Sequence, residues 1–116
     1  MSDKYSSFSE LSANEMPEAY RVVYEKRGTE VALIAPHAGK IEFLTSDICR
    51  EVAQEDLTYY LFEGCKSKSN HDDLHITSTR FDEPNALAIA EDAEIVVTIH
   101  GQAGDTSFVK DRKSVV

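Results

Sequence analysis

Two histidines and one glutamate have the residue types and spacing that a catalytic metal site requires. His37 ends an apolar run that begins at Val31, and Glu42 follows after a short glycine-containing turn. His100 ends a second apolar run that begins at Ile95. Two neutral imidazoles and one carboxylate form a ligand set of catalytic zinc, in which a further position stays open for water. We therefore predict a zinc site built from these three side chains.

The same spacing has a plainer interpretation. A histidine that ends a strand can lie in a hydrogen-bonded loop, and Glu42 would then be a solvated residue at the entry to a helix. Spacing alone leaves this alternative open. A metal site requires His37, Glu42 and His100 to converge at one edge of a sheet, where open α/β folds place their chemistry.

The histidines of a second pair, His71 and His75, are four positions apart. On a helix, two histidines at this spacing can share a metal ion. Here the segment leads into an alternating, β-branched stretch over 74–81, which predicts a solvated loop followed by a strand or an extended segment at the site. His75 is then a candidate to line the site as a hydrogen-bond donor.

The elements that must position these residues alternate between strands and helices. Apolar and β-branched runs predict strands at 20–25, 30–36, 57–62 and 94–99, and helical spacing predicts helices near 46–55 and 82–93. This order predicts an α/β fold with a mixed, largely parallel sheet flanked by helices. The N-cap candidates are Thr45, Ser46 and Asp47 for the first helix and Asp82 for the second, with Pro84 in its first turn.

The two ends of the chain are less regular. Phe8 and Leu11 are placed to anchor a short helical turn near the N-terminus. Residues 102–107 have the composition of a loop, and 108–116 begin like a strand and then stop. We therefore expect a single domain over 1–116, with a sheet that is incomplete at its C-terminal end.

Composition restricts the class of function. The chain has 116 residues, 41% of them hydrophobic, which suffices for a folded core. A net charge of −9 argues against nucleic-acid binding, which needs clustered Lys and Arg. No apolar stretch approaches the ~20 residues of a membrane span, and the first residues have no signal-peptide pattern. We therefore expect a cytoplasmic protein, which could be released by cell lysis. Cys49 and Cys65 are expected to be buried, reduced thiols.

Three segments occur in this order in a known family: 35–42, 74–84 and 97–101. Over about residues 4–105 the chain resembles the phage-related poly-γ-glutamate hydrolases of bacilli and their phages, formerly catalogued as phage-related replication proteins. The resemblance implies a zinc-carboxypeptidase-like fold and zinc-dependent cleavage of the γ-amide bonds of poly-γ-glutamate. It also implies that His37, Glu42 and His100 are the Zn2+ ligands. A central family motif of unassigned role matches His75, Thr77 and Ser78.

Two features depart from the family pattern. Ala38 stands where the family has glycine, and family members are longer, so the resemblance implies C-terminal truncation with the general base beyond Val116. Hydrolysis is then expected to be impaired, with His75 as a possible contributor. The alternatives are a prophage remnant that binds metal without catalysis, or a phage protein of another function.

Overall fold

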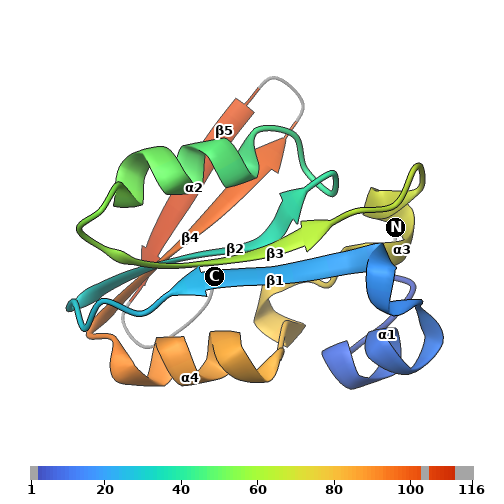
Figure 1. The fold of residues 1–116 in the computed structure, drawn as a ribbon, viewed down its shortest axis with the longest axis horizontal. Coiled ribbons are helices and arrows are strands. Elements are labelled where there is room, and N and C mark those ends of the chain that lie inside the picture. Colours follow the sequence, from blue (N-terminus) through green and yellow to red (C-terminus); the bar gives the residue numbers. More distant parts are fainter. Residues whose placement is uncertain (1–2, 103–104, 112–116) are drawn as a thin grey trace.

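The computed structural model of the chain describes residues 3–102 and 105–111 and shows a five-stranded sheet with helices on both faces (Figure 1). The strands are β1 (Tyr20–Glu25), β2 (Val31–Gly39), β3 (Thr58–Gly64), β4 (Ile95–Gln102) and β5 (Asp105–Asp111). The helices are α1 (Phe8–Asn14), α2 (Thr45–Ala53), α3 (Asn70–Leu74) and α4 (Pro84–Asp92), with short 3-10 turns at Pro17–Ala19 and Ser78–Arg80.

The sheet is mixed, as the alternation of elements predicts. Its order is β1-β3-β2-β4-β5. The three central strands, β3, β2 and β4, are parallel to one another, whereas β1 and β5 pair antiparallel at the two edges. Parallel neighbours need crossover connections. One is supplied by α2, between β2 and β3, and the other by the segment that contains α3 and α4, between β3 and β4.

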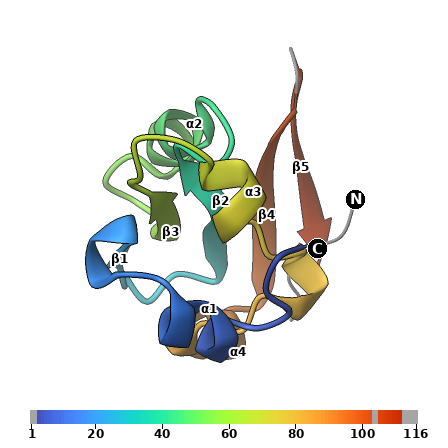
Figure 2. The ribbon, with the colours of Figure 1, turned by 90° about the vertical axis from the view of Figure 1, so that its right-hand side faces the viewer.

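Both faces of the central strands are covered. Figure 2 shows α2 on one side of the sheet and α1 and α4 on the other. The core under α2 includes Leu33, Ala35, Leu61 and Ile99, while Ile34 belongs to the larger core on the opposite face. Double-sided burial explains why β2 reads as a nearly continuous apolar run. In the part of the chain that the structure describes, no helix is long and apolar enough to cross a membrane.

The segment 74–81 is not a strand, and the predicted loop before it is the short helix α3. After α3 the chain is extended at His75 and then forms the 3-10 turn Ser78–Arg80. The apolar alternation has another cause: Leu74, Ile76 and Phe81 are buried in the larger core. The structure thus excludes a strand here and agrees at His75 with the other predicted alternative, an extended segment.

The helix caps also differ from the prediction. Pro84 is in the first turn of α4 as expected, but Glu83 caps the helix: its carboxylate accepts the backbone N–H groups of Asn85 and Ala86, at 3.1 and 3.2 Å. Asp82 instead accepts the N–H of Phe8 at 2.7 Å and so ties α1 to this region.

The start of α2 has no side-chain cap. Its N-cap residue is Leu44, in the left-handed conformation with φ +70°, and none of Thr45, Ser46 and Asp47 caps it. Thr45 instead donates its hydroxyl proton to the Glu42 carbonyl at 2.9 Å. The tight turn after Glu42 therefore determines where α2 begins.

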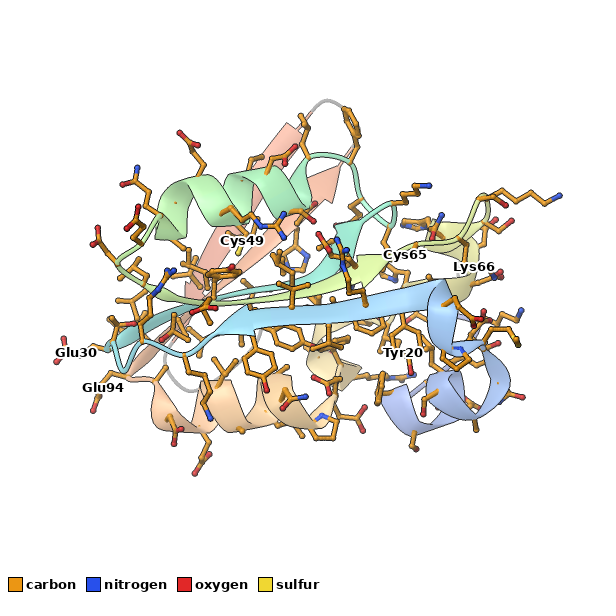
Figure 3. All side chains as sticks on the ribbon, in the orientation of Figure 1. Tyr20, Glu30, Cys49, Cys65, Lys66 and Glu94 are labelled. Carbon is orange, nitrogen blue, oxygen red and sulfur yellow. The ribbon has the colours of Figure 1, made fainter. Side chains whose placement is uncertain are left out.

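Two other predictions need correction. Neither cysteine forms a disulfide, and Cys49 is buried as predicted. Cys65, however, is exposed just beyond β3 (Figure 3). The predicted loop at 102–107 is largely strand, because β4 reaches Gln102 and β5 begins at Asp105. The predicted strand at 108–116 is confirmed for 108–111, and 112–116 lie outside the described residues.

Candidate metal centre

The sheet register brings the two strand-ending histidines to the same edge. In the parallel strands β2 and β4 the last paired residues are Ile34 and Thr98, and His37 and His100 lie three and two residues beyond them. At the other ends of these strands, the Glu30 carbonyl accepts the backbone N–H of Glu94 at 2.8 Å (Figure 3). Both imidazoles therefore stand at the carboxyl end of the parallel strands, as the sequence predicts.

A β-bulge in β2 selects the face on which His37 lies. Between Ala35 and Ala38 the strand advances by three residues while β3 advances by two, from Leu61 to Glu63. Ala35 and Ala38 both pack under α2, so the extra residue turns His37 to the opposite face. Pro36 has no N–H for the ladder, which suits a bulge.

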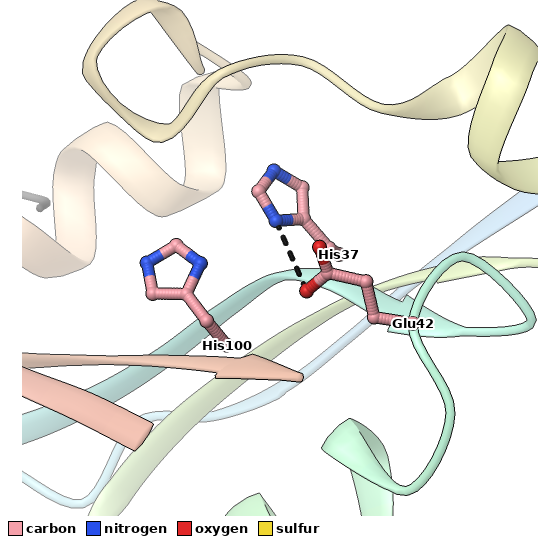
Figure 4. Close-up of side chains that lie close together, drawn as sticks. All are labelled: His37, Glu42 and His100. Atoms are coloured by element: carbon pink, nitrogen blue, oxygen red, sulfur yellow. Dashed lines mark ion pairs between the residues drawn. The ribbon is translucent and has the colours of Figure 1, made fainter. Parts of the chain in front are cut away.

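Glu42 reaches back to His37 from the turn that follows β2. Its backbone N–H donates to the His37 carbonyl at 3.0 Å, and its Oε1 lies 3.4 Å from His37 Nδ1 (Figure 4). The ring centroids of His37 and His100 are 5.4 Å apart. One ligand atom from each of His37, Glu42 and His100 can be chosen so that all lie within 4.8 Å of one another. The structure thus brings the three predicted residues together.

The protonation of His37 suits a metal ligand. Its Nε2 lies 2.6 Å from the Ile76 carbonyl oxygen, which can only accept, so Nε2 carries the proton and donates it. Nδ1 then presents a lone pair, is fully buried and has no hydrogen-bond partner among the described residues. It faces a carboxylate oxygen at 3.4 Å, longer than the usual 2.7–2.9 Å of a charge-assisted hydrogen bond. A cation between two such acceptors would satisfy both, so these residues fit zinc.

His75 forms a second layer over His37. The two rings stack with centroids 3.9 Å apart and an interplanar angle of 23°. His75 Nδ1 lies 2.8 Å from Asp3 Oδ1, and the carboxylate accepts its proton, so the donor atom of His75 is directed to Asp3. Burial lowers the pKa of His75, and the nearby His37 lowers it further, against an opposing effect of Asp3. The imidazole is therefore neutral at pH 7, and its Nε2 faces Glu42 Oε2 at 3.8 Å.

Asp3 is the site residue that sequence reasoning missed. Besides His75, it accepts the backbone N–H of Thr77 at 2.6 Å and the Thr77 hydroxyl at 2.8 Å. Burial raises the pKa of Asp3, but the hydrogen bonds from His75 and Thr77 outweigh that effect and hold the pKa below its usual value. Asp3 and His75 are 72 positions apart in the chain, so local spacing carried no signal of this contact.

Thr77 and Ser78, the other residues of the central family motif, make different contacts. Thr77 binds Asp3, as described above. Ser78 begins the 3-10 turn, where its carbonyl accepts the N–H of Phe81. His71 lies exposed on α3, with its ring centroid 4.7 Å from that of His75. His71 therefore belongs to the edge of the same histidine cluster.

A buried carboxylate fixes the strand end next to His37. Glu63 on β3 is 4% exposed and accepts the Ser46 hydroxyl at 2.7 Å and Arg21 Nε at 2.9 Å. Ser46 in turn accepts the backbone N–H of Gly39 at 2.8 Å. Burial raises the pKa of Glu63, but these hydrogen bonds and the charges of Arg21 and Arg50 more than compensate, so the pKa lies below its usual value.

Replacing Glu63 by Gln is expected to make folding stability less dependent on pH in the acidic range. The pKa of Glu63 is lower in the folded than in the unfolded state, so its ionised carboxylate stabilises the fold. This contribution to folding stability is fully present above the ordinary glutamate pKa of about 4.3. It is lost as pH falls through the folded-state pKa. Urea unfolding at several pH values should therefore show wild type more stable than E63Q near pH 6, with a difference that shrinks towards about pH 3. A difference independent of pH would contradict this assignment.

The chain is similar to known proteins in both sequence and fold. Residues 5–110 match the sequence profile of the family described as "Poly-gamma-glutamate hydrolase". From Bacillus subtilis (strain 168), UPF0714 protein YndL is 48% identical over 108 residues, covering 93% of this chain and 42% of its own length. UPF0714 protein YmaC of the same strain is 46% identical, covering 89% of this chain and 43% of its own length. The chain thus spans about two fifths of the length of these relatives.

Two solved structures share the fold. One, named "YNDL-apo (Zinc-free)", superposes with a TM-score of 0.83 at 46% identity. The other, named "Structure of Bacteriophage poly-gamma-glutamate hydrolase", superposes with a TM-score of 0.80 at 30% identity. Each match covers 87% of this chain and 49% of the other one. The fold described above is therefore that of a substantial part of these proteins.

Proposed function

The chain belongs to the poly-gamma-glutamate hydrolase family, and we propose that it acts as a zinc-dependent hydrolase of γ-glutamyl amide bonds in poly-γ-glutamate, with His37, Glu42 and His100 as zinc ligands. The observation that carries the proposal is the buried Nδ1 of His37, a lone pair without a hydrogen-bond partner that faces the Glu42 carboxylate. The name of the zinc-free YNDL structure supports zinc as the metal in that relative, and the same metal suits this donor set.

In this proposal, hydrogen bonds from His37 and His75 set the tautomers of the two imidazoles. When bound, zinc polarises a carbonyl and lowers the pKa of a bound water. The bond from His37 Nε2 to the Ile76 carbonyl holds the imidazole in the tautomer that leaves Nδ1 as the donor atom. Asp3 does the same for His75, whose Nε2 is left with a lone pair on the Glu42 side of the site. With a single zinc ion bound by His37, Glu42 and His100, that atom is placed to accept a hydrogen bond from water or from a substrate amide N–H.

The shortening of poly-γ-glutamate by the zinc-loaded chain tests this function. We expect the polymer to shorten on gels or by viscosity, but more slowly than with the phage poly-γ-glutamate hydrolase used as a positive reference. His100→Ala should slow cleavage at least about 100-fold, because it removes a ligand of the metal that polarises the amide. Poly-α-glutamate, with the same charge but different linkage, should remain intact.

Two outcomes would contradict the proposal. If the zinc-loaded chain leaves poly-γ-glutamate unchanged, the chain is a metal-binding protein without this activity. If His100→Ala cleaves as fast as wild type, the activity does not depend on the proposed metal ligands.

A further inference from the structure

We propose that the chain holds a second cation, bound by Glu42, His71 and His75 beside the first and sharing Glu42 with it. One ligand atom from each of these three residues can be chosen so that all lie within 4.8 Å of one another. The site is independent of hydrolytic activity, because it requires only the folded chain and a divalent transition metal. Glu42 lies between His37 on one side and His75 on the other.

The two carboxylate oxygens of Glu42 point to different partners. Oε1 lies 3.4 Å from His37 Nδ1, whereas Oε2 lies 3.8 Å from His75 Nε2. A carboxylate that offers one oxygen to each side can bridge two metal ions, and paired sites hold their ions about 3.5–4 Å apart. Glu42 can therefore serve as a bridging ligand between two ions.

The hydrogen bonding of His75 leaves its Nε2 as a metal donor. Nδ1 donates its proton to Asp3, 2.8 Å away, and Asp3 is itself fixed by two hydrogen bonds from Thr77. A carboxylate that orients a histidine in this way is the usual outer layer of a metal site. Nε2 then presents a lone pair to Glu42 Oε2, so two acceptors face each other, as they do at His37. A cation between them would be bound by both atoms.

His71 completes the set from α3. It is the second residue of α3, four positions before the C-cap residue His75, and the two ring centroids are 4.7 Å apart. This spacing places both imidazoles on one side of the helix end, as in helical metal sites. Because His71 is exposed, its side chain can adjust to a metal without disturbing the core. Two imidazoles and a carboxylate favour zinc, cobalt or nickel over magnesium or calcium.

The second cation should bind more weakly than the first. Binding of the second ion must fix the exposed His71 side chain in one conformation. The negative charge of Glu42 is also already partly neutralised by the first ion. Repulsion between two dications a few ångströms apart adds to this, so we expect a Kd weaker by about tenfold or more. The net charge of −9 partly offsets the repulsion.

Zinc titration of the chain, followed by metal analysis after desalting and by calorimetry, tests the second site. The parent protein is Cys65→Ser, because Cys65 is an exposed thiol that could itself bind zinc. We expect two equivalents in the parent, in two steps, and one equivalent in His71→Ala. Asp72→Ala, a change at the next exposed position of α3, should keep both. Cobalt titration should show the same two steps in visible absorption.

The outcomes separate this proposal from the proposed function. One equivalent in both the parent and His71→Ala would overturn the second site and leave the first intact. Two equivalents in His71→Ala would overturn it as well. No tightly bound equivalent in any of these proteins would overturn both sites. Equal thermal melts of the parent and His71→Ala would show that the lost equivalent reflects a lost ligand and not unfolding.

Discussion

Glu42→Gln and His100→Ala are each expected to lower the affinity for the first zinc ion by at least about 100-fold. A catalytic zinc has three protein ligands, and changes to the outer layer alone typically cost about 10- to 100-fold, so loss of a direct ligand should cost more. Glutamine keeps the shape of Glu42 but loses its charge. Alanine at position 100 removes an imidazole that is only partly buried, so the fold should persist. Competition with a chelator of known affinity measures the change.

Asp47→Asn is the matched control for Glu42→Gln. Asp47 is exposed in the first turn of α2, five residues after Glu42, and belongs to neither group of possible ligands. It should therefore retain wild-type zinc affinity. His37 is a less informative test, because its ring is buried and its Nε2 also holds the Ile76 carbonyl. Unchanged affinity in both Glu42→Gln and His100→Ala would rule out this ligand set.

The sequence predicted those features of the site that depend on strand ends. His37 and His100 each follow an apolar run, and parallel pairing alone then brings them to one edge. The face on which His37 lies could not be predicted, because it depends on the bulge between Ala35 and Ala38. Pro36 was the available signal, since proline inside a strand is tolerated chiefly at edges and bulges.

Other features depend on contacts between distant segments. Asp3 acts on His75 across 72 positions, and no periodicity links two such residues. Leu74 and Ile76 alternate with polar residues because both pack into the core, so the local pattern could not decide between a strand and an extended segment. Similarly, Asp82 has the better capping propensity, but Glu83 caps α4 because its carboxylate also accepts the buried Tyr60 hydroxyl at 2.7 Å.

Gly39→Ala is expected to destabilise the fold by about 2–5 kcal/mol, from a backbone penalty and a steric clash at the same residue. Gly39 has φ +64°, a conformation that costs a non-glycine residue about 1–2 kcal/mol. It also pairs with Gly64 of β3, and a Cβ at position 39 would lie 2.8 Å from the Gly64 backbone N and O atoms. Backbone atoms in a sheet cannot move aside as a flexible side chain can, so the strands would have to separate.

Gly28→Ala separates the backbone penalty from the steric clash. Gly28 has φ +68°, but a Cβ there would meet no atom within 4 Å, so this variant should lose only about 1–2 kcal/mol. Urea unfolding measures the loss of free energy of unfolding in each variant. The larger loss in Gly39→Ala, less that in Gly28→Ala, then gives the effect of the close approach between β2 and β3. Since Gly39 lies two residues after His37 and donates to Ser46, separation of the strands should also weaken zinc binding. Equal destabilisation in the two variants would show that packing against Gly64 does not constrain this end of β2.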